Sequence, residues 1–255
     1  MVHCQDVMTF IEQIAPCELA EEWDNVGLLL GDKEGKVENI MLCLDITTAS
    51  VKEALENKVD LMVTHHPVIF RSLNKLLASD PKGKILYSLI KNGISVYTAH
   101  TNLDLAVSGV NTHLANALRL KDIEAYGKGL GKTGFLDNGV NLQDYIEQVK
   151  SGLNVPFVRV VGKANGCIRK VAVFCGSFDD DLDAVIQAKA DVLVTGDLKY
   201  HTAIDAIEAG LCIIDAGHFN TEKKVLPALE TLLKDNFKEI NVYCFKEEED
   251  PFKTY

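Results

Sequence analysis

Short apolar runs alternate with segments of helical periodicity along the whole chain, and this alternation restricts the fold more than any other feature of the sequence. Each run has the length and the continuous apolar character of a strand that is buried on both faces. The runs are Ile40–Leu44, Leu61–Val63, Ile94–Tyr97, Val171–Phe174, Val192–Val194, Leu211–Ile214 and Val242–Phe245. Strands that alternate with helices indicate an α/β protein with mostly parallel sheets.

Helices are predicted in the intervals from apolar spacing, capping residues and prolines. The predicted ranges are Val7–Ile14, Thr48–Leu55, Pro81–Lys91, Ser108–Leu118, Asp179–Lys189 and Thr202–Ala209. Thr47 or Thr48 is expected to cap the second helix, with Val51, Ala54 and Leu55 on its inner face. A further helix after Asn220 contains Pro227, which either kinks it or marks a fresh start. The acidic tail from Lys246 to Asp250 is expected to be solvated.

The second half of the chain repeats the first. Asp60–His66 aligns with Asp191–Asp197 at an offset of 131, and Gly93–Val96 aligns with Gly210–Ile213 at an offset of 117. Any two α/β segments share an order of elements, but the shared Val-Thr pair after each strand favours a duplicated unit. We therefore expect two similar α/β lobes, residues 1–125 and 126–255.

Each half also ends its repeat on a histidine with a carboxylate four residues later. These pairs are His100 with Asp104 and His218 with Glu222, and their mutual offset is 118. Ligand sites of α/β proteins usually lie beyond the carboxyl ends of the strands. The two pairs are therefore expected at the functional ends of their lobes.

Four of the seven histidines lie just past predicted strands: His65, His66, His100 and His218. Imidazole is the commonest protein ligand for zinc, iron and similar ions. Neighbouring side chains of an extended segment point to opposite sides, so His65 and His66 can serve two different metals. A carboxylate can bridge two ions.

Composition excludes several classes of protein. With 26 basic and 37 acidic residues the net charge is −11, which argues against nucleic-acid binding by bulk charge. No apolar run is long enough for a membrane span, and residues 1–6 show no basic segment typical of a secretory signal. The seven cysteines form no C-x-x-C pair, so we interpret them as buried reduced thiols of a cytoplasmic protein. A catalytic or zinc-binding cysteine is the alternative.

One glycine-rich segment, Gly127–Thr133, resembles a phosphate-binding P-loop. That motif requires glycine where this chain has Tyr126, and the segment leads into Gly134–Leu136 instead of a helix. We interpret it as a structural turn. No G-x-S-x-G motif occurs, which argues against a serine hydrolase.

Five segments together resemble the Nif-three-like dinuclear metal centre family, whose members are also called GTP cyclohydrolase 1 type 2 homologs. The segments are E-W-D-N-V-G at 22–27, V-T-H-H-P at 63–67, T-A-H-T-N-L-D at 98–104, T-G-D at 195–197 with His201, and G-H-F-N-T-E at 217–222. The length resembles the short bacterial form, without the middle domain of longer members.

The resemblance implies two α/β lobes with a two-metal site between them, and a toroidal homohexamer whose sites face an internal cavity. The ligands that it implies are His65, His66, Asp104, His218 and Glu222. His66 and Asp104 would hold one ion, His65 and His218 the other, and Glu222 would bridge them. His100 and His201 are then candidates for proton transfer, and Asp197 for supporting a ligand or contacting substrate.

These features predict a two-metal hydrolase in which the ions activate a bridging water. The family name implies opening of the GTP purine ring, while a phosphoesterase or another two-metal hydrolase fits the same ligands. The alternative is a hexameric scaffold or regulatory protein whose metals are not catalytic. Zinc, iron, manganese, nickel and cobalt all accept such ligands. Two divalent ions against two carboxylates leave a cationic site, which suits an anionic small molecule or nucleotide.

Overall fold

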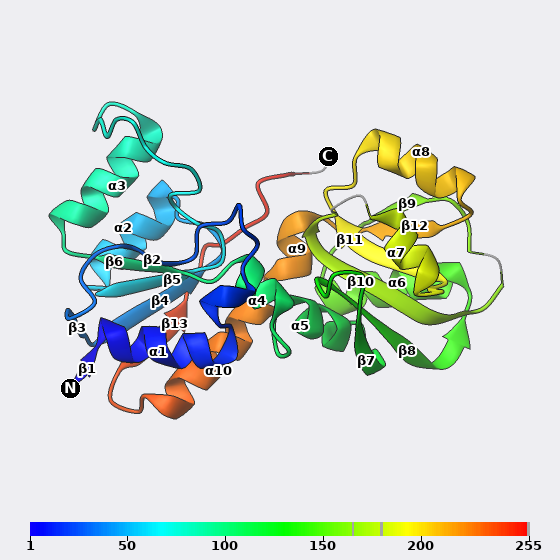
Figure 1. Cartoon of the computed structure of the whole chain (residues 1–255), viewed down its shortest axis with the longest axis horizontal. Helices are drawn as coiled ribbons and strands as arrows, with labels where there is room; N and C mark the ends of the chain where they lie inside the picture. Colours follow the sequence, from blue (N-terminus) through cyan, green and yellow to red (C-terminus); the bar gives the residue numbers. More distant parts are fainter. Residues whose placement is uncertain (165, 179–180, 254–255) are drawn as a thin grey trace. The chain divides into compact units, whose positions relative to one another are not determined.

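The computed structural model describes residues 1–164, 166–178 and 181–253. The chain forms two compact units, each with its own sheet (Figure 1). Unit 1 comprises Met1–Ala106 together with Leu226–Tyr255, and unit 2 comprises Val107–Val225. This division differs from the boundary between residues 125 and 126 that the sequence suggested, because the end of the chain returns to the first unit.

The sheet of unit 1 has the strand order β13-β4-β5-β6-β2. Its strands are β2 (Gly27–Leu30), β4 (Asn39–Cys43), β5 (Leu61–Thr64), β6 (Ser95–Thr98) and β13 (Asn241–Cys244). All neighbours are parallel except β2 and β6. The orange β13 lies beside the blue β4 in Figure 1, with Val242 paired to Ile40. It covers an apolar strand that would otherwise be an exposed edge.

Helices pack their apolar residues against this sheet. They are α1 (Cys4–Ile14), α2 (Thr48–Glu56), α3 (Pro81–Lys91), α4 (Thr101–Leu105) and α10 (Val225–Asn236), with the 3-10 turn η1 (Cys17–Leu19) and the strand pair β1 (Val2–His3) and β3 (Lys36–Val37). Thr47 caps α2 as predicted, since its side chain accepts a hydrogen bond from the Ser50 backbone N–H at 3.1 Å. Val51 and Ala54 lie in the core, but Leu55 is 38% exposed, so its predicted inward orientation is wrong.

The sheet of unit 2 has the order β7-β8-β10-β11-β12-β9. Its strands are β7 (Lys121–Tyr126), β8 (Gly131–Val140), β9 (Arg159–Val161), β10 (Ile168–Ser177), β11 (Val192–Gly196) and β12 (Cys212–Asp215). The central strands β10, β11 and β12 are parallel, and the three flanking pairings are antiparallel. The α/β prediction is therefore confirmed, with antiparallel edges added. The glycine-rich segment begins as the predicted turn, residues 127–130 between β7 and β8, and its last three residues start β8.

The helices of unit 2 are α5 (Val110–Ala117), α6 (Leu142–Leu153), α7 (Leu182–Gln187), α8 (Tyr200–Glu208) and α9 (His218–Glu222). Gly109 and not Ser108 precedes α5, with no side-chain cap. The predicted start of α7, Asp179, lies outside the described residues. Pro227 is the third residue of α10, so it marks a fresh start. Within the described ranges, no helix combines the length and the hydrophobicity that a membrane span requires.

The two units make equivalent hydrogen bonds at positions that the sequence duplication relates. Asp60 Oδ2 accepts from the backbone N–H groups of residues 38 and 39, at 2.8 and 2.9 Å. Asp191 Oδ2 accepts from residues 169 and 170, both at 2.8 Å. Each of these positions is offset by 131, so the same aspartate joins equivalent strands in the two units.

Backbone conformations repeat as well. Lys58 and Lys189 both have positive φ angles, 52° and 54°, where a helix ends before a strand. Gly93 and Gly210 have φ angles of 67° and 72° at the next such point. A left-handed backbone conformation is energetically unfavourable for residues other than glycine. Its occurrence at two equivalent lysines therefore supports the duplication.

The C-terminal tail is only partly solvated, which corrects the expectation for residues 246–250. The Glu248 carboxylate accepts hydrogen bonds from the backbone N–H groups of Leu44, at 2.5 Å, and Asp45, at 3.2 Å. It therefore binds the chain at the carboxyl end of β4.

Candidate metal centre

Three histidines of unit 1 lie together at the carboxyl ends of two adjacent strands. His65 and His66 follow β5, and His100 follows β6 and precedes α4. One ring nitrogen of each lies within 4.8 Å of the corresponding atoms of the other two. Asp104 is on α4, one turn beyond His100. The structure thus brings together the four residues that the sequence nominated in this half of the chain.

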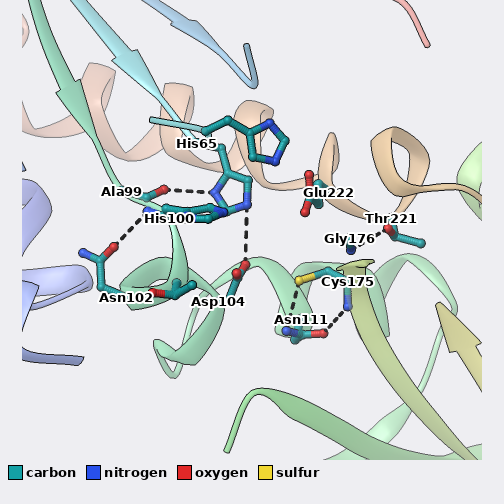
Figure 2. Close-up of polar contacts among 12 residues, drawn as sticks. His65, Ala99, His100, Asn102, Asp104, Asn111, Cys175, Gly176, Thr221 and Glu222 are labelled. Carbon is teal, nitrogen blue, oxygen red and sulfur yellow. Dashed lines mark hydrogen bonds and ion pairs between the residues drawn. The ribbon is translucent and has the colours of Figure 1, made fainter. Parts of the chain in front are cut away.

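The proton on the buried His65 ring can be assigned from its contacts (Figure 2). Nδ1 lies 2.9 Å from the carbonyl oxygen of Ala99, and Nε2 lies 3.6 Å from Asp104 Oδ1. A carbonyl only accepts hydrogen bonds, so Nδ1 carries a hydrogen. Nε2 then faces the side where Asp104 lies, and in a neutral ring its lone pair is available there to a metal ion.

Carboxylates hold the other two rings of this cluster by the same nitrogen. His66 Nδ1 lies 3.1 Å from Asp45 Oδ1, and His100 Nδ1 lies 2.8 Å from Asp24 Oδ1. Such contacts fix the tautomer and the ring orientation of metal-binding histidines. Both carboxylates were missed as partners, although Asp45 follows a predicted strand and Asp24 lies in the E-W-D-N-V-G segment.

The Asp24 side chain is shielded from solvent and holds more than His100. Its carboxylate also accepts hydrogen bonds from the Thr101 hydroxyl, at 2.6 Å, and from the Thr101 backbone N–H, at 3.1 Å. Burial opposes the charged form, but the hydrogen bonds from His100 and Thr101 outweigh it and lower the pKa of Asp24 to about 2. A permanent anion therefore supports the His100 ring.

Unit 2 carries a histidine and a carboxylate on one short helix. On α9, His218 Nε2 lies 3.1 Å from Glu222 Oε1, four residues on. His218 Nδ1 lies 2.9 Å from Asp197 Oδ2, at the end of β11. Asp197 thus orients His218, which is the supporting role that the sequence proposed for it.

Glu222 is buried in unit 2 and is closely surrounded by backbone. A Cβ added to Gly176, whose φ is 63°, would lie 2.3 Å from Glu222 Oε1. The Gly176 N–H donates to the hydroxyl of Thr221, the residue before Glu222, at 2.9 Å (Figure 2). Only glycine leaves room for the carboxylate here, so this strand end is shaped around Glu222.

The two units therefore present matching pairs, His65 with Asp104 and His218 with Glu222. In each pair Nδ1 is bound by an oxygen and Nε2 lies near a carboxylate. Imidazole nitrogen together with carboxylate oxygen is a donor set for zinc, iron, manganese, nickel or cobalt. The residues present fit such ions in their chemistry and in the orientation of their rings.

His201 lies apart from these contacts. It is an exposed residue of α8, and its ring centroid lies 5.5 Å from that of Tyr200. Its participation in proton transfer stays a prediction. Cys4, Cys43, Cys175 and Cys212 are buried as predicted, but Cys17 and Cys244 are only half-buried and Cys167 is exposed, so the interpretation of all seven as buried thiols is wrong for these three. Burial raises the pKa of Cys212 to about 11, which disfavours the thiolate.

Curated proteins of several bacteria are similar to this chain over nearly their whole length. A Clostridium perfringens protein named GTP cyclohydrolase 1 type 2 homolog is 37% identical, and the alignment covers 97% of this chain and 98% of that protein. A Bacillus subtilis protein of the same name is 27% identical, with 98% of each chain covered. The second alignment spans 366 positions, so this relative carries inserted sequence that the present chain lacks.

Solved structures give the same result. A hypothetical protein of Staphylococcus aureus, SA1388, superposes with a TM-score of 0.92 at 33% identity, over 99% of each chain. Reduced HcgD from Methanocaldococcus jannaschii superposes with a TM-score of 0.83 at 30% identity, over 95% of this chain and 97% of that one. A family model described as Duf34/NIF3 (NGG1p interacting factor 3) matches residues 2–251. This chain belongs to the Duf34/NIF3 family.

Proposed function

We propose that this protein is a dinuclear metal-dependent hydrolase that acts on an anionic, nucleotide-like substrate. The observation that carries the proposal is the shared orientation of four imidazoles. Nδ1 of His65, His66, His100 and His218 is bound in each case by a carbonyl or carboxylate oxygen. Metal-binding histidines usually bind an oxygen through the ring nitrogen that does not face the ion. His3 Nδ1 also binds a carbonyl, that of Glu34, so the orientation supports a metal site together with the position of these four rings just beyond strand ends.

The proposed ligands are those that the family resemblance implies. One divalent ion would be held by His66 and Asp104, the second by His65 and His218, with Glu222 as the bridge. Five protein ligands shared by two ions leave coordination positions free for water and substrate, as catalytic sites require and closed structural sites do not. The name of the curated relatives points to GTP as the first substrate to assay.

When bound, the two ions supply an activated water and an electrostatic clamp on a substrate oxygen. The remaining work is done by residues of the chain. Asp24 keeps the His100 ring fixed with Nδ1 occupied, so Nε2 is the atom that accepts or returns a proton. Asp45 and Asp197 hold the His66 and His218 rings in place. His201 is a second candidate for proton transfer.

The resemblance also implies a toroidal homohexamer, which forms part of this proposal. Light scattering tests it, since the assembly should have six times the chain mass of 28.1 kDa. The seven cysteines are all free thiols, which supports the cytoplasm as the compartment.

The test is metal analysis followed by assays of Glu222→Gln. Purified protein should contain two divalent ions per chain. The loaded protein should open the GTP ring or hydrolyse a phosphoester from a panel, and Glu222→Gln should lower that rate by about 100-fold or more, because a neutral amide is a poor bridge between cations. Glu208→Gln, a substitution at an exposed position of α8, is the matched control and should leave the rate unchanged.

Two results would count against the enzyme. Fewer than two ions per chain would exclude the dinuclear site. Equal and slow turnover by wild type and Glu222→Gln would mean that the activity does not arise here, and would favour a metal-binding scaffold.

A further inference from the structure

Unit 1 has an open cavity of about 730 Å³ whose lining includes Asp24, the residue that binds His100. Two segments line it, residues 23–25 and residues 69–72. Its volume falls within the range of sites for small molecules. We propose that this cavity binds a planar heteroaromatic ring that carries an anionic group, and so selects the substrate that is presented to His100.

Two exposed aromatic side chains form a corner in this cavity. The ring centroids of Trp23 and Phe70 lie 5.9 Å apart, with an angle of 67° between the ring planes. Trp23 is 60% exposed and Phe70 is 37% exposed. A flat ligand that stacks on one ring presents its edge to the other, and both arrangements are favourable for aromatic pairs.

His100 adjoins the same corner. Its ring centroid lies 6.3 Å from that of Trp23 and 6.4 Å from that of Phe70. A ring bound on Trp23 or Phe70 therefore lies next to a histidine of the candidate metal centre. This proximity distinguishes the corner from a scattered pair of surface aromatics.

The backbone that carries Trp23 is held firmly on both sides. The Glu21 N–H donates to the Thr101 hydroxyl at 3.0 Å, and the Asp24 carboxylate binds Thr101 and His100. The Asn25 amide donates to the Ile69 carbonyl at 2.5 Å, which joins the two segments that line the cavity. An exposed tryptophan on a fixed backbone is preorganised for a ligand, because binding costs little further ordering.

Arg71 supplies a positive charge at the same cavity. Its side chain is exposed and makes no hydrogen bond or ion pair with the residues that the structure describes. Guanidinium groups bind carboxylates and phosphates with two parallel hydrogen bonds. Two aromatic rings and one uncommitted guanidinium therefore define the ligand class as a flat ring with an anionic substituent.

Trp23 is the chain's single tryptophan, so its fluorescence reports on this cavity alone. The experiment titrates metal-stripped protein with GTP, guanosine and inorganic triphosphate, with N-acetyltryptophanamide correcting for light absorbed by the purine. GTP should quench Trp23 saturably, guanosine should bind several-fold more weakly, and triphosphate should not quench. Absence of saturable quenching by GTP overturns the proposal.

Two variants separate the roles of ring and charge. Phe70→Ala should lower the affinity for GTP and for guanosine alike, by about 10-fold, which is the usual effect of losing a stacking contact. Arg71→Gln should lower the affinity for GTP and leave the affinity for guanosine unchanged. Phe157→Ala repeats the first substitution, and Lys75→Gln likewise removes one positive charge, at exposed positions outside the cavity; both should behave as wild type. Equal affinities in all five proteins overturn the proposal.

Iodide quenching of the free protein adds a third outcome. Trp23 should be accessible to iodide, and protection before any ligand is added would mean that another copy of the chain covers the cavity, which also overturns the proposal. The inference rests on the proposed function only for what happens to the ligand after it binds. If GTP binds but no metal supports its turnover, the hydrolase proposal is rejected and the binding site is retained. If turnover is unchanged in Phe70→Ala and Arg71→Gln, the binding site is rejected and the hydrolase proposal is retained.

Discussion

Glu248 is a carboxylate whose surroundings favour its neutral form. Burial raises its pKa to about 7, although the backbone N–H groups of Leu44 and Asp45 donate to it and lower the value in part. The residue lies in an acidic tail, yet it binds at the end of the strand that leads to Asp45. Its protonation therefore affects how firmly the tail is held near the partner of His66.

We predict that Glu248 makes the folded protein less stable as pH rises. Between pH 4.5 and about 7 the unfolded chain ionises this residue while the folded chain keeps it neutral, so the stabilisation present at low pH is lost. The loss is at most about 3 kcal/mol at 1.36 kcal/mol per pKa unit, and partial exposure reduces it.

Urea unfolding across this pH range checks the prediction. Glu248→Gln cannot ionise, so its free energy of unfolding should fall less than that of wild type between pH 4.5 and 7.5. Glu247→Gln, at the exposed neighbouring position, should follow wild type. Parallel curves for wild type and Glu248→Gln would show that the carboxylate is already ionised in the folded tail.

The histidines that could bind metal were visible in the sequence, and Asp197 was named as a supporting residue, but Asp24 and Asp45 were missed as partners. His65, His66, His100 and His218 were nominated because a strand end is visible in the sequence as an apolar run that stops at a polar residue. Asp24 lies 76 positions before the histidine that it orients, and no periodicity connects the two. Contacts between distant segments depend on tertiary packing, which local patterns do not encode.

At the scale of elements, the parallel strands were readable and the antiparallel ones were not. The buried strands β4, β5, β10 and β11 each contain a continuous apolar run, which in β10 is Val171–Phe174. The edge strand β7 is mostly exposed and has no apolar alternation. A strand that is exposed along most of its length has no continuous apolar run and is therefore harder to recognise.

Asp60 and Asp191 provide a test of the duplication at this scale. Each accepts two backbone hydrogen bonds that join the start of one strand to the start of the next. Asp60→Ala and Asp191→Ala should each lower the free energy of unfolding by about 1–2 kcal/mol, because two donors lose a charged acceptor. The corresponding Asn variants keep an acceptor and should lose less. A cost in one unit and none in the other would mean that only one of the bonds contributes to stability.

At the scale of the molecule, unit 1 is discontinuous and unit 2 is not. Every strand pairing of the unit 2 sheet lies within residues 107–225. The residues of its apolar core come from the same segment. Unit 1 requires the end of the chain. Phe245 lies in its core cluster, and the rings of Phe10 and Phe237 are in edge contact, with centroids 5.6 Å apart.

This difference predicts how fragments behave. The chain 107–225 should fold alone and unfold cooperatively in urea, since it retains its whole sheet. The chain 1–106 should aggregate, because β4 becomes an exposed apolar edge when β13 is missing. Joining 1–106 to 226–255 through a flexible Gly/Ser linker should restore a soluble, cooperatively unfolding protein, and size-exclusion chromatography with circular dichroism measures both properties. If 1–106 folds without the C-terminal segment, the return of the chain to β4 is an addition to unit 1 and not a condition for its stability.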